Sequence, residues 1–116
     1  MSRNDWHILH EEGALIVARS LPVRFDLSVE TVLPFCGKVR LARQIRQDMW
    51  RALQRIRGFS PAVRVAEEQG GLRVTAGGRM EHAYPRRLAE EKLRNLMLDG
   101  NNRARWVACA GGFCYA

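Results

Sequence analysis

Residues 38–57 read KVRLARQIRQDMWRALQRIR, and this stretch decides the fold. Its apolar residues recur every three or four positions, a spacing that places them along one side of an α-helix. Arginines fill much of the other side. We therefore predict a helix that docks on a core through its apolar side and shows a basic side. The apolar residues are Val39, Ala42, Ile45, Met49, Leu53 and Ile56, and the arginines are Arg40, Arg43, Arg51 and Arg55.

The segments on both sides of this helix alternate between polar and apolar residues, which predicts strands with one buried face. One such segment precedes the helix, and two flank a turn at Gly70-Gly71. A last strand, which does not alternate, is predicted after a second helix that begins at Pro85. The order strand–helix–strand–strand–helix–strand is the split βαβ arrangement of ferredoxin-like folds. The predicted strands are residues 23–29, 62–67, 72–76 and 105–109, and residues 6–9 and 15–19 predict an additional N-terminal hairpin.

The length and composition are those of a single globular domain over residues 1–116. We expect an α+β, two-layer sandwich in which both helices cover one face of the sheet. No apolar run reaches the 18 residues of a membrane span, and no secretory signal opens the chain, so the sequence predicts a cytoplasmic protein. Three cysteines without an export signal favour reduced thiols.

The net charge of +7 and the isoelectric point near 10.3 favour an acidic partner, either nucleic acid or an acidic protein surface. Arginine supplies 17 of the 19 basic residues. This bias is also typical of GC-rich bacterial genomes, so the charge has a compositional explanation as well as a functional one.

The predicted topology gathers one arginine from each of four strands on the open face of the sheet. In one interpretation these are the ordinary polar positions of a half-exposed sheet. In the other they form an anion-binding face, because the guanidinium fork suits phosphate and carboxylate groups. Either a partner, a second copy of the chain or the acidic residues Glu11 and Glu12 would then balance the charge. The four residues are Arg24, Arg64, Arg73 and Arg105.

Catalytic and metal-binding motifs are weak in this chain, and no cofactor is predicted. Gly37-Lys38 lacks the earlier glycine and the following hydroxyl residue of a phosphate-binding loop. Ser60 lies outside a nucleophile-elbow motif. The histidines and cysteines match no metal-ligand spacing, and the predicted topology puts Cys36 and Cys109 at opposite ends of the sheet. The residues weighed for ligation are His7, His10, His82, Glu11, Cys36, Cys109 and Cys114.

The sequence therefore predicts a small, non-enzymatic binding domain. RNA-recognition sheets stack bases on aromatic residues, and residues 62–67 and 72–76 contain none, so nucleic acid would bind through phosphates, with steep salt dependence. Trp50, at the edge of the helix stripe beside Arg43 and Arg46, is an anchor for a partner or a seal of the core. An enzyme or enzyme subunit whose site forms between subunits is the alternative.

Overall fold

A computed structural model describes residues 6–81 and 85–111 of the chain. The predictions made for His82 and Cys114 lie outside these residues. The structure is α+β and is compatible with the predicted two-layer sandwich. Its elements are β1 (His7–Glu11), β2 (Ala14–Ala18), β3 (Leu27–Leu33), α1 (Lys38–Leu53), β4 (Phe59–Glu68), β5 (Gly71–Met80), α2 (Arg86–Leu98) and α3 (Gly100–Cys109).

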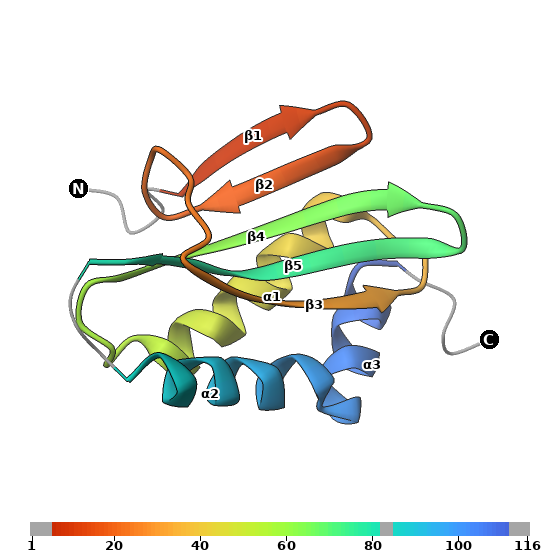
Figure 1. Ribbon diagram of the computed structural model, residues 1–116. Coiled ribbons are helices and arrows are strands. Elements are labelled where there is room, and N and C mark those ends of the chain that lie inside the picture. The colour runs from red at the N-terminus through yellow and green to blue at the C-terminus, as the bar shows by residue number, and fades with distance from the viewer. Residues whose placement is uncertain (1–5, 82–84, 112–116) are drawn as a thin grey trace.

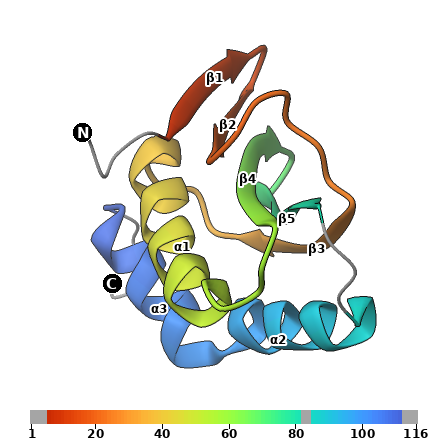
Figure 2. The same ribbon diagram turned by 90° about the vertical axis from the view of Figure 1, so that its left-hand side faces the viewer.

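The strands form one antiparallel sheet in the order β1-β2-β4-β5-β3. The predicted N-terminal hairpin is confirmed as β1 and β2, and it extends the sheet beyond β4. All three helices lie on the same side of the sheet (Figures 1 and 2). In the described part of the chain, no helix is long and apolar enough to cross a membrane.

The core fills the space between the sheet and the helices, as the alternation predicts. Val63 and Val65 of β4 and Val74 of β5 are completely buried, and α1 contributes Ile45 and Met49, which are also completely buried. Each such side chain contributes about 1.5 to 3 kcal/mol when it leaves water. The docking role predicted for the apolar side of residues 38–57 is therefore confirmed.

The predicted strand at residues 23–29 is only partly right. The observed strand β3 begins at Leu27, and residues 19–26 instead cross the face of the sheet opposite the helices (Figure 1). There Val23 and Phe25 pack against a second apolar cluster of Ile16, Ala18 and Ala62. The predicted strand would have placed Val23 and Phe25 beneath the helices. Their alternation instead reflects contact with the open face of the sheet.

The strand predicted at residues 72–76 is longer in the structure. It is β5, which includes Gly77 and Gly78 and continues to Met80. Both are glycine because the neighbouring backbones come very close. A Cβ atom on Gly77 would lie 2.0 Å from the carbonyl oxygen of Leu27, and one on Gly78 would lie 2.1 Å from that of Ser60. These glycines allow β3 and β4 to pair with the same strand.

The predicted last strand at residues 105–109 is wrong, because these residues belong to α3. The helix begins at Asp99, whose side chain accepts a hydrogen bond from the backbone N–H of Asn102 at 2.9 Å, a standard N-cap. Arg103 then donates to the hydroxyl of Thr31 at 2.6 Å and to the carbonyl of Val32 at 2.9 Å. A helix side chain thus occupies a hydrogen-bonding position of the edge strand β3.

Candidate anion-binding surface

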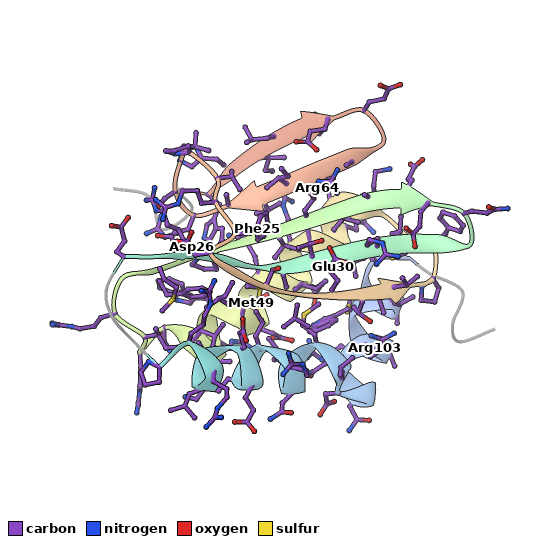
Figure 3. All side chains as sticks on the ribbon, viewed as in Figure 1. Phe25, Asp26, Glu30, Met49, Arg64 and Arg103 are labelled. Atoms are coloured by element: carbon purple, nitrogen blue, oxygen red, sulfur yellow. The ribbon has the colours of Figure 1, made fainter. Side chains whose placement is uncertain are left out.

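The predicted sheet-face arginines of β4 and β5 are on the open face, but each has acidic neighbours. Arg64 donates to Glu11 of β1 at 3.2 Å. Arg73 donates to Glu68 at 2.9 Å and to Glu30 of β3 at 3.2 Å, and these hydrogen bonds raise the pKa of its guanidinium. Figure 3 shows Arg64 and Glu30 on this face. The expected acidic cover is present, with Glu11 as one of its members.

Arg24 lies on the segment that crosses the open face, not on a strand. Its guanidinium pairs with Asp26 at 2.7 Å. The Asp26 carboxylate also accepts the backbone N–H of Met80 at 2.8 Å, and this bond together with Arg24 lowers the pKa of Asp26. The pair anchors the crossing segment to the end of β5. Because that segment covers part of the sheet face, it leaves a smaller area for the predicted homodimer contact.

Arg105 is not part of the open face, because α3 replaces the predicted last strand. It lies on the helix side and donates to Asp48 of α1 at 2.6 Å. The same carboxylate accepts the indole N–H of Trp106 at 2.7 Å, and Trp106 is completely buried. Asp48 is the one buried charged side chain in residues 6–81 and 85–111. This cluster joins α1 to α3 and is structural.

The arginines of α1 and of the turn that follows it, which holds Arg55, differ from those of the sheet. Arg40, Arg43 and Arg55 are exposed. Within the described part of the chain, none of the three forms an ion pair. Arg51 lies 3.8 Å from Asp48, but its side chain is 68% exposed, so that contact is weak. The second predicted patch is therefore the one whose charges remain available to a ligand.

The net charge of the protein is concentrated on the same segment. Residues 38–57 hold seven basic residues and one acidic residue, a net charge of +6, whereas the whole chain carries +7. A helix turns by about 100° per residue, so Arg40, Arg43, Gln47 and Arg51 form one ridge on the side away from the core. At 1.5 Å per residue, Arg40 and Arg51 are about 16 Å apart along that ridge.

A hollow lies beside the ridge, between the N-terminal hairpin and α1. It has a volume of about 320 Å³, and none of the described residues that line it is acidic. Trp6 and Trp50 meet edge to face near it, with ring centres 6.4 Å apart. The lining residues are Trp6, Ile8, Val17, Arg43 and Arg46.

Two cations lie close to these rings. The Arg46 guanidinium is 4.8 Å from the centre of the Trp6 ring, and that of Arg19 is 5.8 Å from the centre of the Trp50 ring. Both distances are typical of cation–π contacts. Burial, together with the charge of Arg43, lowers the pKa of Arg46. The hollow therefore combines aromatic surface with positive charge.

Helical spacing groups Arg43, Arg46 and Trp50 in the sequence, because they follow one another at three and four residues. The same pattern does not include Trp6 or Arg19. No local pattern connects Trp6 with Trp50, which meet because the N-terminal hairpin packs against α1 through β2.

Metal ligation finds no support in the described residues, where no group of three His, Cys, Asp or Glu side chains gathers. The predicted separation of Cys36 and Cys109 is wrong. The backbone N–H of Gly37 donates to the carbonyl of Ala110 at 2.9 Å, so the residues next to the two cysteines are hydrogen-bonded to each other. The cause is α3, which brings its C-terminal end back to the start of α1.

Comparison with known proteins gives no match to a protein-family model, to a curated protein or to a solved structure.

Proposed function

We propose that this chain is a small, non-enzymatic, cytoplasmic bacterial domain that binds a nucleic-acid backbone along α1. The observation that carries the proposal is the contrast between its two sets of arginines. Those of the sheet face pair with carboxylates at 2.7 to 3.2 Å, whereas Arg40, Arg43 and Arg55 have no such partner in the described residues. An acidic ligand therefore gains the most electrostatic binding energy on α1.

The shape of the ridge supports a polymer of regularly spaced charges. A length of about 16 Å equals the rise of four or five base pairs, at about 3.4 Å of duplex axis per phosphate of each strand. Arginine at these positions can form paired hydrogen bonds with phosphate oxygens. Contacts of this kind fix the position of the backbone and carry no sequence information. We therefore expect binding to unrelated sequences with similar affinity.

The test is the salt dependence of binding to a labelled oligonucleotide of arbitrary sequence, followed by fluorescence anisotropy. Each phosphate contact contributes about 0.7 to 0.9 to the slope of log K against log salt. Replacement of Arg40 and Arg55 by Gln should reduce the slope by about 1.4 to 1.8. The matched control replaces Arg64 and Arg73 by Gln, which removes the same charge from the sheet face and should leave the slope unchanged.

Affinity that does not weaken between low and physiological salt would contradict the proposal. So would a larger loss in the Arg64 and Arg73 variant than in the Arg40 and Arg55 variant. An acidic protein is the other predicted partner, and polyglutamate is its probe. Binding to polyglutamate without binding to oligonucleotides would identify a protein partner, and a pull-down from lysate with and without nuclease would make the same distinction.

A further inference from the structure

The hollow between β1 and α1 differs from the rest of the basic surface because it offers aromatic rings as well as charge. Within residues 6–81 and 85–111, its lining holds Arg43 and Arg46 together with Trp6, Ile8 and Val17, and no carboxylate. The Nε atom of Arg46 is buried and has no hydrogen-bond partner among the described residues. A buried donor without an acceptor costs about 1 to 3 kcal/mol. That atom is closed to the hollow, so an anionic ligand there would interact with the overall charge of the Arg43 and Arg46 side chains that line it.

The ligand should carry a flat apolar part as well as a negative charge. Trp50 does not line the hollow itself, but it is 42% exposed and its ring meets that of Trp6, which does line it. The volume of about 320 Å³ is at the lower end of the range for small-molecule sites. It suits one nucleotide and is too small for a folded segment of protein. Phosphate would lie against the arginines and the base against the indoles.

We propose that this hollow and the adjoining ring of Trp50 bind one nucleotide unit of a single-stranded nucleic acid, with its phosphate on Arg43 and Arg46 and its base stacked on Trp50. The inference rests on the proposed function, because the strand must continue along the α1 ridge. Single strands are specified because the bases of a duplex stack on each other and cannot reach a protein ring. Residues 62–67 and 72–76 of the central strands contain no aromatic residue, and here Trp6, just before β1, and Trp50 of α1 supply aromatic surface.

The experiment compares a 12-nucleotide oligo-dT strand with the same strand in duplex with oligo-dA, by anisotropy at fixed salt. The wild-type chain should bind the single strand at least about tenfold more tightly, since stacking adds to the backbone contacts. Trp50→Leu should lose about tenfold on the single strand and keep its affinity for the duplex, whereas Trp50→Phe should retain most of the binding. Circular dichroism confirms that each variant is folded.

A second measurement uses the arginine of the hollow. Arg46→Gln should weaken binding of the single strand more than Arg94→Gln, a change of equal charge at an exposed position of α2. Thymidine monophosphate should quench tryptophan fluorescence at concentrations where inorganic phosphate does not. Equal quenching by inorganic phosphate would overturn the inference, because it would show a site for a bare anion.

The outcomes separate the two proposals. Equal affinity for single strand and duplex, with no effect of Trp50→Leu, would overturn the nucleotide site and leave backbone binding on α1 intact. Failure to bind either form would overturn the proposed function, and the inference with it. Polyglutamate binding that depends on Arg46 and Trp50 as strongly as oligo-dT binding would assign the hollow to an acidic protein and overturn the inference.

Discussion

The carboxylate of Asp48 is the clearest test of how the helices are held together. It is buried on α1 and accepts the indole N–H of Trp106 at 2.7 Å and the guanidinium of Arg105 at 2.6 Å. Asp48→Ala removes the acceptor of both donors and leaves the buried N–H without a partner. Arg105 can turn to water, because its side chain is 47% exposed, but Trp106 cannot.

The size of the stability loss follows from the environments of Arg105 and Trp106. A hydrogen bond to a charged group contributes about 1.5 to 3 kcal/mol, and an orphaned buried donor costs about 1 to 3 kcal/mol. We expect Asp48→Ala to lower the free energy of unfolding by about 2 to 3 kcal/mol. Arg105→Ala should lower it by less than about 1 kcal/mol, because exposed ion pairs contribute little. Asp48→Asn keeps one acceptor oxygen, so its loss in free energy of unfolding should fall between those of Asp48→Ala and Arg105→Ala.

Urea denaturation monitored by circular dichroism measures the difference. With a slope of about 1 to 3 kcal/mol per molar, Asp48→Ala should shift the midpoint by about 1 M or more. In a Trp106→Phe background the buried donor is already gone, so Asp48→Ala should cost about 1 to 2 kcal/mol less than in the wild type. A loss for Asp48→Ala no larger than that for Arg105→Ala, or additive losses in the double mutant, would refute this account of the α1–α3 contact.

Two other predictions concern the β3–β5 end of the sheet. Gly77→Ala should destabilise the protein by about 2 kcal/mol or more, because its Cβ would lie 2.0 Å from the Leu27 carbonyl oxygen. Gly100→Ala, at the first residue of α3 with open space around it and no positive φ, is the comparison by thermal melting. The folded pKa of Asp26 lies below its ordinary value of 3.8, so its ionised form stabilises the fold. The stability lost in Asp26→Asn should be constant above about pH 5. It should shrink as pH falls below 3.8, and a gap that widens on acidification would contradict the assignment.

Local sequence patterns identified the elements whose period is long and unbroken. The apolar spacing of residues 38–57 predicted α1 and its buried side, and alternation predicted the strands at residues 62–67 and 72–76. The same patterns failed where the segment is short. Residues 105–109 consist of Arg105 followed by four apolar residues. In a run this short, periodicity does not distinguish a strand from a buried helix. The cap at Asp99 and the helical spacing of Arg103, Trp106 and Ala110 were the signals for α3.

For the candidate site, the sequence by itself determined where positive charge is concentrated, because residues 38–57 carry most of it whatever the fold. Tertiary structure decided which charges are balanced. Arg64 meets Glu11 across 53 positions of sequence, and Arg73 meets Glu30 across 43. The hollow also exists only in the folded chain, where β1 places Trp6 against Trp50. Strand order and helix packing fix such distant pairs, and no local pattern encodes them, since each depends on contacts made by the whole sheet.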